Sequence, residues 1–194
     1  MSAGRTNTKQ KSVDWCTPPK YVFAINKFFE NSIDFDPCAN VYSLINAKKK
    51  ILLPQNGLEL DWNYKHIFVN PPYGSDRVRK TTIKHWIAKC EAAFRTFHAE
   101  VLALIPVATN TRHWKDYIFG KAAGICFLYD TRLHFYLNGQ EDIKGAPMSC
   151  AMIYWGVNTA KFIDVFKAYG AALDLSASLG VMFGQDGGDG DVVD

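Results

Sequence analysis

Short, largely apolar runs alternate with amphipathic stretches along most of this chain. Runs bounded by polar or turn residues cover 32–36, 67–69, 101–106, 125–129 and 149–155. In the stretches 18–29, 81–97, 113–119 and 159–169, apolar residues recur at intervals of three and four, which is typical of helices. Buried strands that alternate with helices predict an α/β fold, with a mostly parallel twisted sheet covered by helices on both faces.

Three other segments carry weaker signals. Thr17 is a candidate N-cap for the first helix, with Pro18 at the first helical position. Residues 39–49 are compatible with a helix, and the turn-rich stretch 52–62 with one short strand. The connection 130–148 has 19 residues, which is long for a compact domain and indicates a functional loop.

The charge pattern separates the two ends from the rest of the chain. We expect a basic flexible arm at 1–13, a single domain at 14–183 and an acidic, disordered tail at 184–194. The tail holds four aspartates, so the rest is more basic than the net charge of +3 suggests. Such a surface permits a polyanionic partner.

Composition excludes several classes of protein. No apolar run approaches the roughly 18 residues of a membrane span, and the basic start lacks the apolar core of a signal peptide. We therefore expect a soluble protein in the cytoplasm of a bacterial or host cell, with no membrane partner. The five cysteines are widely spaced without a CxxC pair, which indicates neither a disulfide framework nor a metal site.

The ends of three expected strands carry polar residues or proline. Asp36, Asn70 and Pro106 each lie at, or just past, the end of an apolar run. In parallel sheets, ligands bind in the crevice at the carboxyl ends of the strands. The sequence therefore predicts that these three positions border one shared crevice.

The segment IFVNPPYG, from Ile67 to Gly74, has an unusual strand end. Prolines lack an N–H, so Pro71 and Pro72 leave carbonyl oxygens with few backbone donors nearby. The Asn70 side chain adds an amide oxygen, and Tyr73 a flat aromatic face. This set fits an exocyclic amino group on a planar heterocycle, held by two accepted hydrogen bonds and by stacking.

At these residues the sequence resembles the phage-type DNA N-6-adenine methyltransferases, which carry NPPY as their fourth motif. The resemblance covers about residues 14–156. Its points are DWCTPP (14–19), DFDPCA (34–39), LDW (60–62), FVNPPYG (68–74), ALIP with RHW (103–106 and 112–114), TRLHF (131–135) and GAP (145–147). It implies a Rossmann-like methyltransferase fold with an antiparallel last strand.

The resemblance also implies S-adenosylmethionine as methyl donor and a flipped-out adenine of double-stranded DNA as acceptor. Asn70 and the Pro71 carbonyl would bind the adenine amino group, Pro72 would fix the turn, and Tyr73 would stack on the base. The cofactor residues that it implies are Trp15, Thr17, Pro18, Asp36, Pro37, Cys38, Ala39 and Asp61. Asp36 would meet the ammonium of the methionine part, whereas Asp61 would either contact the cofactor's adenine or serve only as a strand-end residue.

One feature departs from the family pattern. The first motif usually continues with glycines after its Asp-Pro pair, but here Ala39 is followed by NVYSL. No glycine occurs from residue 5 to 56. The tight glycine turn that lets a cofactor approach the backbone is therefore missing from this loop.

Two basic segments are candidates for DNA contact. The stretch after NPPY contains Arg77, Arg79, Lys80 and Lys84 against only one acidic residue, a composition that suits phosphate contacts. The long connection contains Arg132 and His134, interleaved with aromatics that suit base contact.

Three alternatives remain open at this point. The amino acceptor could be cytosine N4 or a protein glutamine, because related enzymes share the NPPY chemistry. A catalytically inert DNA-binding module on the same scaffold would also explain the missing glycines. No metal ion is implied by any of these interpretations.

Overall fold

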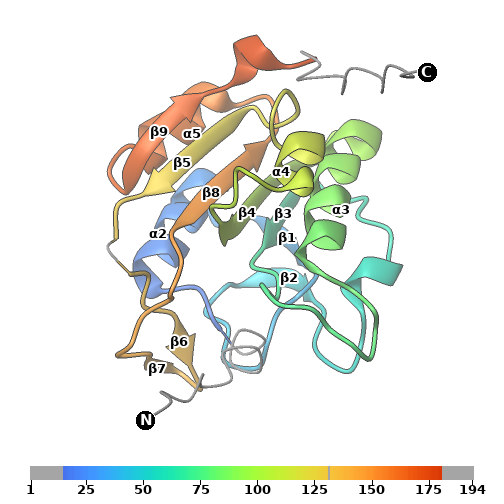
Figure 1. Ribbon diagram of the computed structural model, residues 1–194, viewed down its shortest axis with the longest axis vertical. Coiled ribbons are helices and arrows are strands. Elements are labelled where there is room, and N and C mark those ends of the chain that lie inside the picture. The colour runs from blue at the N-terminus through green and yellow to red at the C-terminus, as the bar shows by residue number, and fades with distance from the viewer. Residues whose placement is uncertain (1–14, 131, 181–194) are drawn as a thin grey trace, which may run out of the picture.

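The computed structural model describes residues 15–130 and 132–180 of the chain. The expected arm at 1–13 and tail at 184–194 lie outside these residues. Seven strands form one sheet in the order β2-β1-β3-β4-β8-β5-β9 (Figure 1). The strands β1 to β4 in this sheet pair in parallel, while β8 is antiparallel to both of its neighbours and β9 to β5. Five of the seven strands therefore run in one direction.

The strands and helices follow the expected alternation closely. The strands of the sheet are β1 (Ile33–Asp36), β2 (Ala47–Lys50), β3 (His66–Val69), β4 (Glu100–Pro106), β5 (Gly124–Leu128), β8 (Cys150–Trp155) and β9 (Gly170–Asp174). The helices are α2 (Pro19–Phe28), α3 (Ile83–Phe97), α4 (Arg112–Tyr117) and α5 (Thr159–Phe166). A 3-10 turn spans Gly57–Glu59, and a second spans Ser176–Ser178.

Two hydrophobic layers cover the two faces of the sheet. One layer joins α2 and α5 to one face, and the other joins α3 and α4 to the opposite face. Successive residues of β4 alternate between them, with Leu102 and Leu104 in the first layer and Val101, Ala103 and Ile105 in the second. The prediction of helices on both faces is confirmed, and the Rossmann-like α/β architecture with it.

The expected helix at 39–49 is wrong. Asn40 Oδ1 accepts the backbone N–H of Tyr42 at 2.8 Å, and Ser43 Oγ accepts that of Ile45 at 3.3 Å. Such local hydrogen bonds favour turns over helix. The following residues form β2, which pairs with β1 in parallel, so a partner distant in sequence decides this element.

Two smaller expectations also need correction, and one strand was missed. Residues 52–62 contain the 3-10 turn and no strand. The first helix begins one residue later than expected, with Pro18 at the N-cap position and Pro19 at the first helical position. The edge strand β9 was not anticipated, because its small, half-exposed residues carry no strand periodicity.

The long connection 130–148 contains a two-stranded hairpin, β6 (Tyr136–Leu137) and β7 (Gln140–Glu141). Asn138 and Gly139 both adopt positive φ, at 51° and 79°. An Asn-Gly pair in this conformation is a strong sequence signal for a two-residue hairpin. The sequence therefore contained the information for this element, although it was expected only as a loop.

Across the described stretches 15–130 and 132–180, no helix is long and apolar enough to span a membrane.

Candidate functional site

The carboxyl ends of β1, β3 and β4 meet at one edge of the sheet. The parallel pairs β1–β3 and β3–β4 bring Asp36, Asn70 and Pro106 to this edge, as the sequence predicted. β1 lies between β2 and β3, so the chain leaves it toward one side and returns on the other. Ligands bind at such a switch point in open α/β sheets.

The amide of Asn70 has a fixed orientation. Its Nδ2 donates to the backbone carbonyl of Trp15, 55 residues earlier in the chain, at 3.0 Å. A carbonyl only accepts hydrogen bonds, so the nitrogen must face Trp15. Asn70 Oδ1 then points away from this contact, and no described residue donates to it.

The two prolines leave a second acceptor beside this oxygen. Neither the Pro71 nor the Pro72 carbonyl accepts a hydrogen bond from the described residues. Pro71 is buried and Pro72 half-buried, so water reaches them poorly. Asn70 Oδ1 and the Pro71 carbonyl together form a pair of unoccupied acceptors next to each other in the chain. Such a pair suits a donor with two hydrogens on one nitrogen.

Tyr73 belongs to a cluster of three aromatic rings. Its ring lies edge-on to Trp15, with centroids 6.0 Å apart, and to Phe135 at 5.7 Å. Trp15 and Phe135 stack face to face at 4.8 Å. The Tyr73 hydroxyl donates to the Leu104 carbonyl at 3.1 Å, and burial raises its pKa well above the ordinary value. The ring is therefore held at its hydroxyl end, while the side chain remains partly exposed.

The connection 130–148, which contains the β6–β7 hairpin, reaches this cluster by pairing with the segment around Cys16. Cys16 and Tyr136 exchange two backbone hydrogen bonds, of 2.8 and 3.1 Å. This pairing places Phe135 against Trp15. Three segments that are far apart in sequence, 15–19, 70–73 and 132–137, thus converge on one site.

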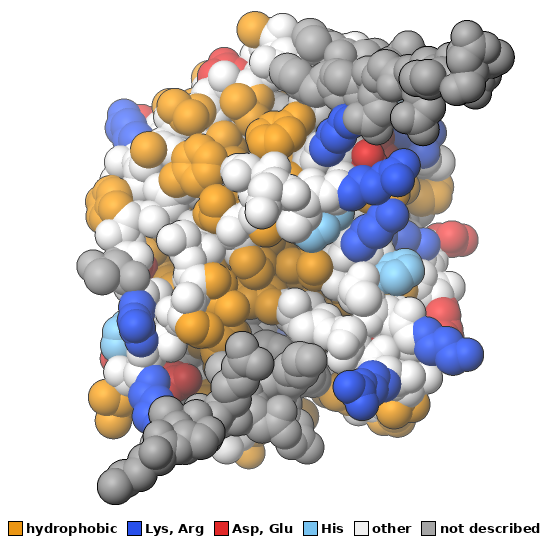
Figure 2. Space-filling view, in the orientation of Figure 1, with side chains coloured by type: hydrophobic (Ala, Val, Ile, Leu, Met, Phe, Trp, Pro, Cys, Tyr) orange, Lys and Arg blue, Asp and Glu red, His pale blue; other side chains and the backbone are white. Residues whose placement is uncertain are grey.

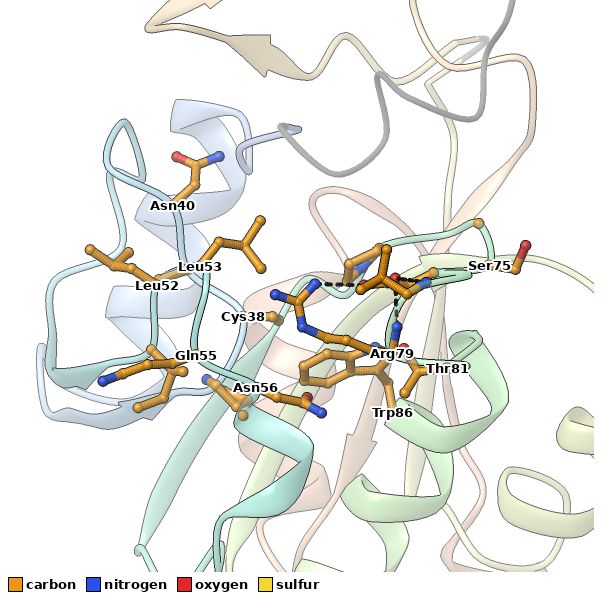
Figure 3. Close-up of a pocket in the computed structure, with 18 of the residues that line it drawn as sticks. Cys38, Asn40, Leu52, Leu53, Gln55, Asn56, Ser75, Arg79, Thr81 and Trp86 are labelled. Atoms are coloured by element: carbon orange, nitrogen blue, oxygen red, sulfur yellow. Dashed lines mark hydrogen bonds and ion pairs between the residues drawn. The ribbon is translucent and has the colours of Figure 1, made fainter.

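A cavity of about 610 Å3 adjoins the site, within the range typical of small-molecule pockets (Figure 3). Its walls come from the segments after β1, β2 and β3, namely 37–41, 51–57 and 72–81, with Trp86 of α3. Of the expected cofactor residues, Pro37, Cys38 and Ala39 line it. Asp76 is the one carboxylate among the described lining residues, and it is paired with Arg79 at 2.7 Å.

Asp36 lies directly beneath the loop that lines this cavity. Its side chain is 3% exposed, and Oδ1 accepts the backbone N–H of Cys38 at 3.1 Å. Burial raises the pKa of this carboxyl to about 7, only partly opposed by the Cys38 N–H and the positive charge of Lys50. A cation placed above the loop would favour the ionised form.

Cys38 links the cavity to the NPPY segment. Burial raises the pKa of its thiol well above the ordinary value, and the neighbouring Asp36 raises it further. The backbone N–H of Asn70 contacts the same sulfur, so the two motifs touch. A thiol held in its neutral form is a poor nucleophile.

Gly57, in the segment after β2, packs very closely against the loop after β1. A Cβ on Gly57 would lie 2.0 Å from the carbonyl oxygen of Pro37, so only glycine fits there. Gly57 also accepts the indole N–H of Trp62 at 2.9 Å, which fixes its position. Gly57 therefore allows the segment after β2 to pack tightly against the loop after β1.

The remaining expected cofactor residues do not line the cavity. Thr17 and Pro18 are buried before α2, on the side of Trp15. The indole N–H of Trp15 has no hydrogen-bond partner among the described residues, although the side chain is only 8% exposed. Asp61 is exposed and not among the lining residues, whereas its neighbour Trp62 is completely buried.

The expected DNA-binding residues fall into two separate groups. Arg77, Lys80 and Lys84 are exposed beside the cavity and the start of α3. Arg132 and His134 lie near the hairpin, where they line a second cavity of about 350 Å3 next to the start of α2. Figure 1 shows α3 and the hairpin on opposite sides of the sheet's carboxyl edge.

Sequence reasoning did not single out the basic side chains of α4, which lie on the same side of the molecule as those of α3 (Figure 2). Lysine and arginine side chains gather over the α3–α4 side of the molecule (Figure 2). Arg112 is highly exposed in its ion pair with Asp116, at 3.4 Å. Lys84 and His113 lie in the first turns of α3 and α4, which pack against each other, and burial and the charge of Lys84 lower the pKa of His113. The RHW motif at 112–114 carried this signal.

Comparisons with known proteins identify the family of this chain. The family model for DNA N-6-adenine-methyltransferase (Dam) matches residues 5–170. The chain is 26% identical to the DNA N-6-adenine-methyltransferase of Haemophilus phage HP1 over 140 residues, which cover 71% of this chain and 76% of that protein. No solved structure matches. The chain therefore belongs to the DNA N-6-adenine-methyltransferase family, and this membership supports methylation of adenine in DNA.

Proposed function

We propose that this protein transfers a methyl group from S-adenosylmethionine to N6 of an adenine flipped out of double-stranded DNA. The observation that carries the proposal is the pair of unoccupied acceptors, Asn70 Oδ1 and the Pro71 carbonyl, beside a partly exposed aromatic ring. A base inside the duplex is out of reach of such a site, so it must leave the stack.

The acceptor pair would bind both hydrogens of the adenine amino group. The nitrogen lone pair of this group is delocalised into the ring, which makes it a weak nucleophile. Two accepted hydrogen bonds from preorganised oxygens favour a more tetrahedral nitrogen and localise the lone pair there. The Trp15 carbonyl contributes by holding the Asn70 amide in the orientation that presents oxygen.

Tyr73 would stack on the extruded base. Its hydroxyl bond to Leu104 and its edge contacts with Trp15 and Phe135 hold the ring in place before a base enters. A ring that is already fixed loses little conformational entropy on binding. Because Asn70 is an amide, it cannot accept the proton that the amine loses, and we propose that this proton leaves to water.

The residues around the cavity fit the cofactor. S-adenosylmethionine, when bound, supplies an electrophilic methyl group on a sulfonium. The Asp36 carboxyl, whose pKa is raised by burial, would gain a counter-charge from the ammonium of the methionine part. Pro37, Cys38 and Ala39 would form the wall beneath it. The Trp15 indole N–H, which donates to no described residue, would donate to an acceptor on the cofactor or base.

The DNA would lie along the carboxyl edge of the sheet. We propose phosphate contacts from Arg77, Lys80 and Lys84 on one side, and contacts from Arg132 and His134 on the other. The site lies between these groups, which suits a duplex that spans both. The proposed contacts are electrostatic and should weaken with salt.

Two observations bear on the alternatives. The family match supports adenine over cytosine N4 and protein glutamine as the acceptor. An inert scaffold has no need of the oriented Asn70 amide, so this feature favours an active enzyme.

The direct test is incubation of the protein with double-stranded DNA and methyl-labelled S-adenosylmethionine, followed by nucleoside analysis. We expect the label in N6-methyladenine, and we expect Asn70→Ala to lower the rate by at least a hundredfold. Absence of labelled N6-methyladenine across DNA of diverse sequence would reject the function. An Asn70→Ala variant with full activity would reject the assigned role of the amide.

A further inference from the structure

The turn that follows the NPPY segment is closed by its own hydrogen bonds. Asp76 and Thr81 exchange two backbone hydrogen bonds, of 2.8 and 3.0 Å. Asp76 Oδ1 accepts the backbone N–H groups of Val78 at 2.9 Å and Arg79 at 3.0 Å. The turn therefore has a definite shape that does not depend on a ligand.

Arg79 crosses from this turn to the opposite wall of the cavity. Its Nη1 pairs with Asp76 Oδ2 at 2.7 Å, and its Nη2 donates to the carbonyl of Pro54 at 2.9 Å. Pro54 belongs to the loop after β2, whereas Arg79 belongs to the segment after β3. In Figure 3 the guanidinium lies between these two walls of the cavity. One side chain thus joins two segments that are separate in sequence.

The two other basic residues of this turn do not join the cavity walls in this way. Arg77 and Lys80 of the same turn are exposed, and neither forms an ion pair with a described residue. The Arg79 side chain is only 26% exposed, and each of its two Nη atoms already donates one hydrogen bond within the cavity wall. Contact with a DNA phosphate would compete with the ion pair to Asp76, whereas Lys80 has no ion pair with a described residue to lose.

We propose that Arg79 is a positioning residue of the cofactor pocket and does not contact DNA. Its two-armed contact holds the segment after β3 against the loop after β2, so that the cavity keeps its width. The same turn continues directly from Tyr73, so this contact also fixes the distance between the cofactor pocket and the base site. The inference rests on the proposed function, in which this cavity holds S-adenosylmethionine.

The test compares Arg79→Gln with the matched control Lys80→Gln, which removes the same charge from the same turn. Cofactor affinity is measured by calorimetry with S-adenosylmethionine, and DNA affinity by titration of a duplex at several salt concentrations. We expect Arg79→Gln to weaken cofactor binding about tenfold and to leave the salt slope unchanged. Lys80→Gln should leave cofactor binding unchanged and lower the salt slope by about one.

Two further variants separate geometry from charge. Arg79→Lys keeps the charge but lacks the planar fork, so it should still raise the KM for the cofactor while kcat changes little. Asp76→Asn keeps an oxygen for the backbone N–H groups of the turn and removes the charge that holds Arg79. It should reproduce the loss of cofactor affinity, and it decides the matter if Arg79→Gln does not fold.

The outcomes distinguish the inference from the function beneath it. Wild-type cofactor affinity in Arg79→Gln, together with a salt slope lowered by about one, would overturn the inference and make Arg79 a phosphate contact. If the wild-type protein itself fails to bind S-adenosylmethionine, the proposed function fails, and the inference fails with it. Weakened cofactor binding with an unchanged salt slope supports both.

Discussion

Replacing Asp36 with asparagine should remove a fall in stability between pH 5 and pH 8. Burial raises the pKa of this carboxyl from 3.8 to about 7 in the folded protein. The unfolded chain therefore ionises the group first, and the folded protein binds more protons across that window. Stability contributed by this group falls as pH rises from about 4 to about 7 and is constant above. Asparagine keeps an oxygen for the Cys38 N–H but has no charge to desolvate.

The size of the effect follows from the two pKa values. Holding the proton in the folded state costs about 2 kcal/mol at pH 5, where the pH exceeds the unfolded pKa by about one unit. At pH 8 the full difference between 3.8 and about 7 applies, which corresponds to about 4 kcal/mol. The variant should therefore gain about 2–3 kcal/mol relative to wild type between pH 5 and pH 8.

Urea unfolding of both proteins at pH 5 and pH 8 measures this difference. The comparison with wild type cancels other groups, because Asn changes only this one titration. A variant whose stability relative to wild type is the same at both pH values would refute the raised pKa. A variant that is less stable only at pH 8 would show instead that the Asp36 charge is stabilised by Lys50.

Titration of the Asp36 carboxyl also tests the proposed placement of the cofactor. At pH 6 an α-amino group carries its charge, and its approach would favour ionisation of Asp36. Binding of S-adenosylmethionine should then release protons from the wild-type protein but not from Asp36→Asn. Calorimetry in two buffers with different ionisation enthalpies detects this release. Equal binding heats in both buffers for the wild type would place the ammonium elsewhere.

Three further changes test other parts of the site. Gly57→Ala should destabilise the protein by about 1–3 kcal/mol and weaken cofactor binding, because its Cβ meets the Pro37 carbonyl; thermal melts and calorimetry measure both. Tyr73→Phe should lower the free energy of unfolding by about 1 kcal/mol through the lost bond to Leu104, yet keep kcat within a few-fold, whereas Tyr73→Ala should lose most activity. If the highly exposed Arg112 also contacts a phosphate, Arg112→Gln should lower the salt slope of DNA binding by about one without changing cofactor affinity, and an unchanged slope would show that Arg112 makes no such contact.

Much of the fold was predictable because its signals are local. The runs at 67–69, 101–106 and 149–155 became β3, β4 and β8, and the helical periodicity at 81–97 became α3. Apolar runs and intervals of three and four residues are read within single segments. The errors at β2 and β9 occur where a short strand owes its state to a partner distant in sequence.

The chemistry of the acceptor site was also contained in the sequence. An asparagine and two prolines at a strand end specify acceptors without donors in any structure that keeps the strand. The carboxyl edge followed from the alternation of strands and helices. Which residues bind the cofactor and the DNA stays a prediction, as set out for Asp36 and for the basic segments.

Only the tertiary structure decided how these parts face one another. The Trp15 carbonyl orients the Asn70 amide, Gly57 packs against the Pro37 carbonyl, and Arg79 reaches Pro54 across the cavity. Each contact joins segments that lie apart in the sequence and become neighbours only in the folded chain. No local sequence pattern in one segment specifies the segment that it will contact. The sequence by itself therefore determined the acceptor groups. The packing of the sheet determined the orientation of these groups and the pocket beside them.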